Sequence, residues 1–398
     1  MNEECLASLR FYNTRYDKIS REHEGSFKWI WAHDEYRNWS TPDASRLLHI
    51  EGKPGSGKST IARYFGDHFL EREEALKSAI VAKFFYSDRE GEPQRSHYNM
   101  LRSILYDILD QDEAFFYHHF QTEYRLQRRR GLRVNWEYVK LESVLKSLQD
   151  HSPARRLYLI IDAVDESEEK DRRDVLNLLF ELCSKTKYCI VKVFVASRPL
   201  GQFEPHKVHN LIRLQDETKS DISSFAHSLL DRLNLTHVLA QATEYIVENA
   251  EGVFLWVKLV GEELLTCKEQ GFSEEDIIEF LKRLPKELEV FYTLMFERMN
   301  TNKLGLRNPW NTQDLRNLRD LQDGVKLFRF VLFARRPLTV DELRHALVIS
   351  SNLGTKFTPD DSLQEYSLPS KQRIIYGGGN FLEIKPHHGT GATYPFKP

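Results

Sequence analysis

The sequence predicts an α/β chain, built as a three-layer sandwich with a mainly parallel sheet and followed by an all-helical arm. Three observations lead to this prediction. A glycine-rich turn joins a short apolar strand to a helix within residues 47–70. Two near-continuous apolar runs, at 157–161 and 190–195, are typical of parallel strands that are covered on both faces. After about residue 216, the spacing of apolar residues becomes that of helices.

Bulk composition limits the class of protein. A chain of 398 residues is too long for one small core, so two or three domains are expected. The net charge of -3 argues against a nucleic-acid partner. No apolar run approaches the ~18 residues that a membrane span needs, and the N-terminus lacks the features of a signal peptide. The four cysteines show no metal-ligand spacing, which is typical of buried, reduced thiols. We therefore expect a cytoplasmic protein without a membrane span.

The expected elements follow in chain order. Residues 1–45 are rich in aromatic and charged side chains, which predicts a helical linker segment packed beside the first domain. Within residues 46–215, strands and helices alternate, which predicts a parallel sheet with ligands beyond the carboxyl ends of its strands. After the glycine-rich turn we expect a strand, a helix, a strand, a helix and a strand, at residues 80–86, 100–109, 157–161, 175–182 and 190–195.

The spacing of apolar residues in the second half of the chain predicts helices. Within residues 216–285, helical spacing occurs in four segments, at 221–233, 238–251, 253–265 and 274–284. Residues 286–376 continue this pattern, with an irregular polar stretch at 300–318. Residues 377–398 show no periodicity, so we expect an irregular, poorly ordered tail.

The glycine-rich turn carries the clearest chemistry. Residues 52–59 match the phosphate-binding P-loop pattern G-x-x-x-x-G-K-[ST], in the required order of strand, loop and helix. Its glycines let backbone amides surround phosphate oxygens, its lysine supplies positive charge, and its final hydroxyl can ligate Mg²⁺. A glycine-rich turn without a ligand is the alternative. We expect ATP or GTP to bind at Gly52, Lys53, Pro54, Gly55, Ser56, Gly57, Lys58, Ser59 and Thr60, with Ser59 on the metal.

Besides the Ser59 hydroxyl, the metal needs a carboxylate ligand. The strand at 157–161 runs into Asp162, and a carboxylate at the tip of a strand beside the P-loop strand would face Mg²⁺. We therefore predict that Asp162 is a metal ligand. Asp165 or Glu166, just beyond it, could orient or deprotonate an attacking water. The alternative is a charged, solvated helix start capped by Ser167.

An arginine follows the last expected strand. Pro199 cannot continue the strand, so Arg198 lies at its carboxyl end, where it is predicted to contact a γ-phosphate. The alternative for Arg198 is a surface salt bridge. The arginines within 125–133 indicate a solvated helix end rather than a nucleic-acid contact. The histidine pairs His118–His119 and His206–His209 have no third metal ligand near them in the sequence, so we assign them no metal site.

These motifs, taken together, resemble a known family. The runs at 48–60 and 159–166 resemble the NACHT class of signal-transducing P-loop NTPases (the STAND class), and in particular the nephrocystin-3-like branch of fungal NOD-like receptors. Similar stretches occur at 27–30, 196–199 and 252–256, in the same order, so the resemblance covers roughly residues 5–385. It implies a P-loop nucleotide-binding domain at 46–215, a helical arm at 216–285 and a winged-helix-like region at 286–376.

The resemblance also implies a function. It implies a switch that is closed with diphosphate, and open and self-associating with triphosphate, in signalling like that of fungal innate immunity or heterokaryon incompatibility. Its partners would be effector or repeat-domain proteins. Ala163 stands where fast ATPases carry a glutamate, which predicts slow hydrolysis.

Several features depart from the family pattern. Neither an effector segment nor repeats flank the core in this sequence, and the run at 252–254 lacks the proline of the related Gly-x-Pro motif, so ATP and GTP both stay open. The alternatives are a truncated, non-switching nucleotide-binding remnant and a P-loop kinase.

Overall fold

The computed structural model describes most of the chain, namely residues 2–41, 44–72, 79–129, 134–150, 156–184, 188–200, 210–235, 237–288, 290–292, 327, 330–331, 334, 338–351, 384–386 and 393–395. The chain divides into two compact units, Met1–Lys258 and Leu259–Pro398. The first unit holds the sheet and every residue of the predicted site.

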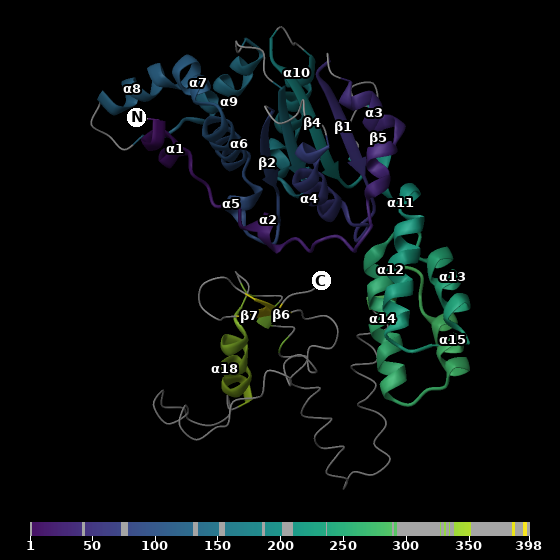
Figure 1. Cartoon of the computed structure of the whole chain (residues 1–398). Coiled ribbons are helices and arrows are strands. Elements are labelled where there is room, and N and C mark those ends of the chain that lie inside the picture. Colours follow the sequence, from purple (N-terminus) through teal and green to yellow (C-terminus); the bar gives the residue numbers. More distant parts are fainter. Residues whose placement is uncertain are drawn as a thin grey trace. The chain divides into compact units, whose positions relative to one another are not determined.

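The sheet has five parallel strands in the order β2-β3-β4-β1-β5 (Figure 1). Their bounds are β1 Arg46–Glu51, β2 Ile80–Phe85, β3 Arg156–Asp162, β4 Ile190–Ser197 and β5 Asn210–Arg213. The predicted parallel sheet is thus confirmed. One detail differs from expectation: β4 lies between β1 and β3, so the strand that ends in Asp162 is not the neighbour of the P-loop strand.

Helices cover both faces of this sheet, which gives the predicted three layers. Alternate residues of β3 belong to opposite cores, as the period of two in a strand requires: Leu157, Leu159 and Ile161 face one core, while Tyr158 and Ile160 face the other. The first core includes residues of α6 His97–Gln111, α9 Tyr138–Lys146 and α10 Glu169–Ser184. The second includes residues of α3 Asp34–Ser40 and α4 Lys58–His68.

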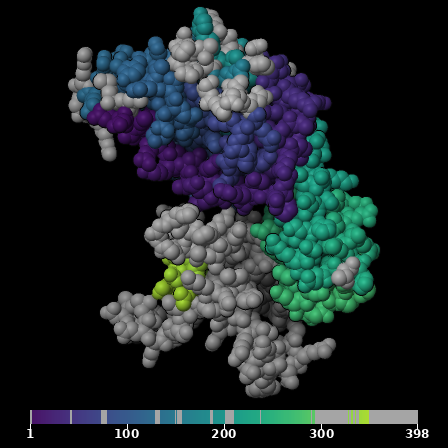
Figure 2. Space-filling view, viewed as in Figure 1, coloured from purple at the N-terminus to yellow at the C-terminus, as the bar shows by residue number. Residues whose placement is uncertain are grey.

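The N-terminal segment packs onto the sheet. It contains α1 Asn2–Leu9, α2 Thr14–Lys18 and the short helix η1 Lys28–Ala32, followed by α3. Trp39 of α3 is fully buried, and its indole N–H donates to the carbonyl oxygens of Arg46 at 3.0 Å and Val193 at 3.2 Å. Figure 2 shows this segment, in purple, on the surface of the first unit. The aromatic residues before the P-loop therefore belong to the fold of that unit.

The edge strand β2 is capped by side chains of α6. The Gln111 amide accepts from the backbone N–H of Val81 at 2.9 Å and donates to the carbonyl oxygen of the same residue at 2.7 Å. The Asp107 carboxylate accepts from the backbone N–H of Lys83 at 2.9 Å. These bonds satisfy backbone groups that an edge strand otherwise leaves open.

Shorter elements connect these layers. They are η2 Phe69–Glu71, α5 Glu92–Arg95, α7 Glu113–Phe115, η4 Phe116–Phe120, α8 Gln121–Arg129, η5 Ser147–Asp150, η6 Val164–Glu166 and α11 Leu214–Glu217.

The four helical segments predicted within residues 216–285 are each present as a helix. They are α12 Lys219–Asp231, α13 Leu239–Asn249, α14 Phe254–Glu269 and α15 Glu274–Arg283. The capping box of α15 pairs the side chains and backbone amides of Ser273 and Asp276, which fixes its first turn. None of the described helices combines the length and apolar character that a bilayer crossing requires.

The second unit is described only in part after α15. Its further elements are α18 Val340–Ser351 and two short antiparallel strands, β6 Ile384–Pro386 and β7 Thr393–Pro395. This strand pair lies within residues 377–398, where we expected no regular structure. The predicted polar stretch at 300–318 lies outside the described residues, and the winged-helix-like region stays a prediction.

Candidate nucleotide-binding site

The P-loop lies between β1 and α4 and needs its glycines. Gly55 and Gly57 have φ angles of 75° and 92°, a left-handed conformation that other residues rarely adopt. A Cβ atom on Gly55 would lie 2.7 Å from the Cβ atom of Leu255, and one on Gly52 would lie 2.5 Å from the Ser56 hydroxyl oxygen. Gly57 is the residue just before α4, so the amides of the first helical turn are available to an anion.

Lys58 folds back across this loop. Its ammonium group donates to the carbonyl oxygens of Gly52 and Lys53, each at 2.9 Å. Burial lowers the pKa of Lys58, while the nearby carboxylates of Asp165 and Asp162 act in the opposite direction. The positive charge of the loop therefore lies close to the predicted metal and catalytic carboxylates.

Asp162 is the last residue of β3. The residue is fully buried, and neither of its carboxylate oxygens has a partner of normal geometry among the described residues. Burial raises the pKa of Asp162 to about 6, and the nearby Ser59 hydroxyl and the charge of Arg15 partly offset that rise. Two unsatisfied oxygens beside a serine hydroxyl fit the oxygen ligands that Mg²⁺ prefers. Because β4 separates β3 from β1, Asp162 reaches this place from two strands away.

Asp165 and Glu166 lie in η6, directly after Asp162. Ala163 turns the chain there with a left-handed φ of 54°. The Asp165 carboxylate accepts from the backbone N–H of Arg198 at 3.2 Å, and the Glu166 carboxylate accepts from the backbone N–H of Asp88 at 2.9 Å. Both predicted water-orienting residues are thus held by neighbouring loops.

Arg198 follows β4 and pairs with Asp165. The two side chains approach to 3.4 Å between Nε of the arginine and a carboxylate oxygen, and the arginine side chain is 52% exposed while that of Asp165 is 9% exposed. The structure therefore brings Lys58, Asp162, Asp165 and Arg198 together at the carboxyl ends of β1, β3 and β4.

A contact that sequence reasoning missed comes from residues 251–255. The backbone N–H of Leu255, at the start of α14, donates to the carbonyl oxygen of Gly55 at 3.1 Å. Glu251 forms an ion pair with Lys53 at 2.8 Å. Phe254 lies beside Gly57, and its ring centroid is 5.9 Å from that of Phe27. The run at 252–256 contributed to the family resemblance, but no local pattern placed it on the P-loop.

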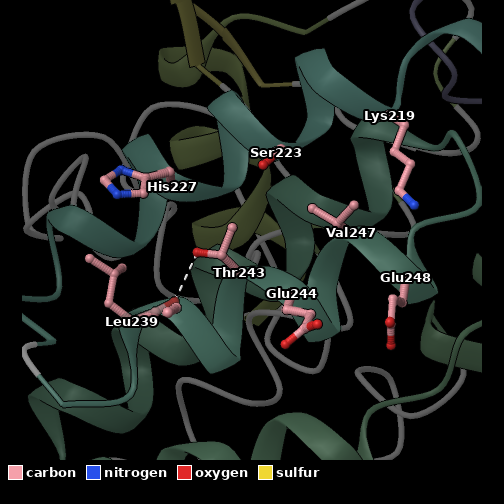
Figure 3. Close-up of a pocket in the computed structure, with 9 residues that line it drawn as sticks. Lys219, Ser223, His227, Leu239, Thr243, Glu244, Val247 and Glu248 are labelled. Atoms are coloured by element: carbon pink, nitrogen blue, oxygen red, sulfur yellow. Dashed lines mark hydrogen bonds between the residues drawn. The ribbon is translucent and has the colours of Figure 1, made fainter.

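A groove lies elsewhere in the first unit, between α12 and α13 (Figure 3). Its volume is about 610 Å³, and it is lined by Lys219, Ser223, His227, Leu239, Ala240, Thr243, Glu244, Val247 and Glu248. The Thr243 hydroxyl donates to the Leu239 carbonyl oxygen at 2.9 Å inside it. No P-loop residue lines this groove, so it is separate from the candidate site.

Comparisons with known proteins bear on the family that this chain resembles. Residues 25–198 match the family model described as nephrocystin 3, N-terminal. The chain is 24% identical to vegetative incompatibility protein HET-E-1 of Podospora anserina over 401 residues. That match covers 96% of this chain but only 27% of the relative.

Two solved structures are also similar. A Walker-type ATPase of Pyrococcus abyssi is 14% identical, with a TM-score of 0.37, and the match covers 98% of this chain and 97% of that chain. Cdc6p of Pyrobaculum aerophilum is 12% identical, with a TM-score of 0.39 and a coverage of 98% of this chain and 93% of that chain. The fold assignment itself follows from the parallel sheet. The family model over residues 25–198 and the Podospora relative confirm the predicted resemblance to a NACHT-like family.

Proposed function

We propose that the chain is a nucleotide-dependent signalling switch that binds Mg-ATP or Mg-GTP and hydrolyses it slowly. The observation that supports this most directly is the buried Asp162 carboxylate, whose two oxygens have no hydrogen-bond partner of normal geometry among the described residues. A buried, unpaired carboxylate costs free energy unless a cation satisfies it. Its position near Lys58 and Ser59 makes a metal-bound polyphosphate the occupant that fits.

Each residue of the site would have a distinct role in binding and hydrolysis. Ser59 and Asp162 would hold Mg²⁺, which when bound neutralises charge on the β- and γ-phosphates. Lys58 would exchange its two loop carbonyl acceptors for phosphate oxygens. Asp165 or Glu166 would orient the attacking water or take its proton. Arg198 would release Asp165 and contact the terminal phosphate.

A switch also needs a link from the loop to a second element. The bond from the Leu255 amide to the Gly55 carbonyl and the Lys53–Glu251 ion pair provide one within the first unit. A nucleotide that moves the P-loop changes these contacts, and its free energy of binding then biases the start of α14 between two positions. We infer that the triphosphate-bound form self-associates and that effector or repeat-domain proteins are its partners.

Hydrolysis is expected to be slow. Ala163 follows Asp162, and both nearby acids already accept backbone hydrogen bonds. We expect a steady-state turnover below about 1 per second with ATP or GTP. Faster turnover, or transfer of the phosphoryl group to a small acceptor, would favour a P-loop kinase over a switch. Binding that leaves exchange at the amides of residues 250–258 unchanged between diphosphate and triphosphate would favour the non-switching remnant.

Asp162→Asn is expected to abolish the Mg²⁺ dependence of nucleotide binding, because a neutral amide is a poor ligand for this ion. It should also raise the stability of the nucleotide-free protein by on the order of 1 kcal/mol, since it removes a buried charge. Titration calorimetry with and without magnesium, combined with thermal melts, measures both effects. A variant whose metal dependence matches that of the parent would make Asp162 a structural residue.

Arg198→Ala is expected to narrow the difference in affinity between triphosphate and diphosphate by roughly tenfold, because a charged hydrogen bond to the terminal phosphate contributes about 1.5–3 kcal/mol. Arg213→Ala is the matched control: like Arg198, this arginine lies at the carboxyl end of a strand, and it pairs with a carboxylate, Glu51, at 3.7 Å. Competition binding with both nucleotides gives the ratio. An unchanged ratio in Arg198→Ala would leave that residue as a surface ion pair.

A further inference from the structure

The short helix α2 in the N-terminal segment is fixed at the carboxyl end of β2. In the sheet register, Phe85 of β2 lies beside Asp162 of β3. The Gln94 amide donates both to the Asn13 side chain at 2.7 Å and to the Phe85 carbonyl oxygen at 2.6 Å. The ring of Tyr16 contacts that of Phe85 edge-on, with the centroids 5.1 Å apart. Residues 13–16 are therefore held next to the strand end that accompanies Asp162.

The same helix is also fixed to α4. Ser59, Arg63 and Asp67 are spaced at helical intervals of four, so they lie along one face of α4. The Arg63 guanidinium donates to the carbonyl oxygens of Tyr16 and Ile19, and the Tyr16 hydroxyl donates to the Asp67 carboxylate. Thus α2 is bound both to the end of β2 and to the helix face that begins at the predicted metal ligand Ser59.

Arg15 lies between these two sets of anchors. Its buried Nε has no hydrogen-bond partner in the part of the chain that the structure describes. Its charge lies close enough to the Asp162 carboxylate to interact with it. A buried guanidinium nitrogen without an acceptor is costly, and a guanidinium matches the geometry of phosphate oxygens. An anion beside Asp162 and its metal would supply the missing acceptor.

We propose that Arg15 of α2 contacts the terminal phosphate of the bound nucleoside triphosphate. This inference rests on the proposed nucleotide site and adds an N-terminal residue to it. Arg15 then acts together with Lys58 from the P-loop. Because a diphosphate lacks the terminal group, the contact forms only with triphosphate. The phosphate thereby stabilises α2 and the residues on either side of it in one nucleotide state.

The test compares Arg15→Ala, Arg15→Lys and the control Arg21→Ala, which removes an exposed arginine of the same segment. Each full-length variant is titrated with magnesium and a non-hydrolysable ATP or GTP analogue, and separately with ADP or GDP. For Arg15→Ala we expect triphosphate affinity to fall roughly ten- to a hundredfold and diphosphate affinity to fall less than about threefold. Arg15→Lys should lie between this variant and the parent, because lysine keeps the charge but not the fork of donors. Arg21→Ala should match the parent.

Hydrogen exchange gives a second measurement, which would show no dependence on triphosphate if Arg15 had a purely structural role. Triphosphate should slow exchange of the amides at residues 13–20 in the parent and in Arg21→Ala, but not in Arg15→Ala. If Arg15→Ala lost affinity for triphosphate and diphosphate equally, or preferred triphosphate as strongly as the parent does, the contact would be refuted. A parent chain that binds neither nucleotide would instead refute the nucleotide site itself, and the Arg15 contact with it.

Discussion

Lys58→Ala is expected to weaken binding of Mg-ATP and Mg-GTP by more than about a hundredfold. The lysine ammonium is the charge that the P-loop offers to the β- and γ-phosphates, and charged hydrogen bonds contribute about 1.5–3 kcal/mol each. Within the described part of the chain, this group bonds to the Gly52 and Lys53 carbonyl oxygens. Alanine is also the best helix former for the first position of α4. The fold should therefore survive while binding is lost, which calorimetry and thermal melting would show together.

Lys53→Ala is the matched control for this result. Lys53 lies in the same loop, but its side chain is 45% exposed and pairs with Glu251. An exposed ion pair contributes little, so its loss should change affinity by less than about threefold. If Lys58→Ala bound triphosphate as tightly as the parent, the phosphates would not lie in this loop. If both lysine variants lost binding equally, the general charge of the loop, rather than the position of Lys58, would be responsible.

Gly252→Ala is expected to destabilise the first unit by about 2–5 kcal/mol. Gly252 has a φ of 80°, and a left-handed alanine costs about 1–2 kcal/mol. An added Cβ atom would also lie 2.4 Å from the Cβ atom and 2.5 Å from the Cα atom of Gln215. The backbone at Gly252 or Gln215 must then move, because a Cα atom cannot be displaced by a side-chain rotation. Overpacking of this kind costs about 1–3 kcal/mol more. Denaturant titration followed by tryptophan fluorescence measures the loss.

Gly25→Ala separates the two causes. Gly25 has a similar φ of 85°, but no atom lies within 4 Å of the position that its Cβ atom would take. Gly25→Ala should lower the free energy of unfolding by only about 1–2 kcal/mol, which is the cost of the left-handed conformation alone. The displaced residues 251–255 in Gly252→Ala should also weaken nucleotide binding, because Leu255 bonds to the loop at Gly55. Equal stability losses in the two variants would mean that residues 250–252 adjust without strain.

The sequence predicted the parts of the site that depend on local pattern. The P-loop is contiguous, and its glycine spacing follows from the close approach of backbone to phosphate. Asp162 was found because a strand buried on both faces is a continuous apolar run, so its end is visible as a change to charged residues. Asp165, Glu166 and Arg198 were placed by the same logic of strand ends, and the structure shows all of them near Lys58.

The parts that the sequence did not predict are non-local. Strand order is decided by tertiary packing, so nothing near β3 indicates that β4 separates it from the P-loop strand. The four residues of β5 are too few for a pattern. The bond from Leu255 to Gly55 spans about two hundred positions, and the charge of Arg15 acts on Asp162 although the two are also far apart in the sequence. These are the contacts that connect a phosphate site to the rest of its unit.

The capped edge of β2 limits how copies of this chain can assemble. The backbone N–H and C=O of Val81 are bonded to Gln111 and the Lys83 amide is bonded to Asp107, so an incoming strand finds these donors and acceptors already occupied. Oligomers that grow by extending the sheet past β2 are therefore disfavoured. On this side of the sheet, a triphosphate-driven assembly would have to use side-chain surfaces, which a change of state can expose or cover, whereas the backbone groups of an open strand edge are always available for pairing.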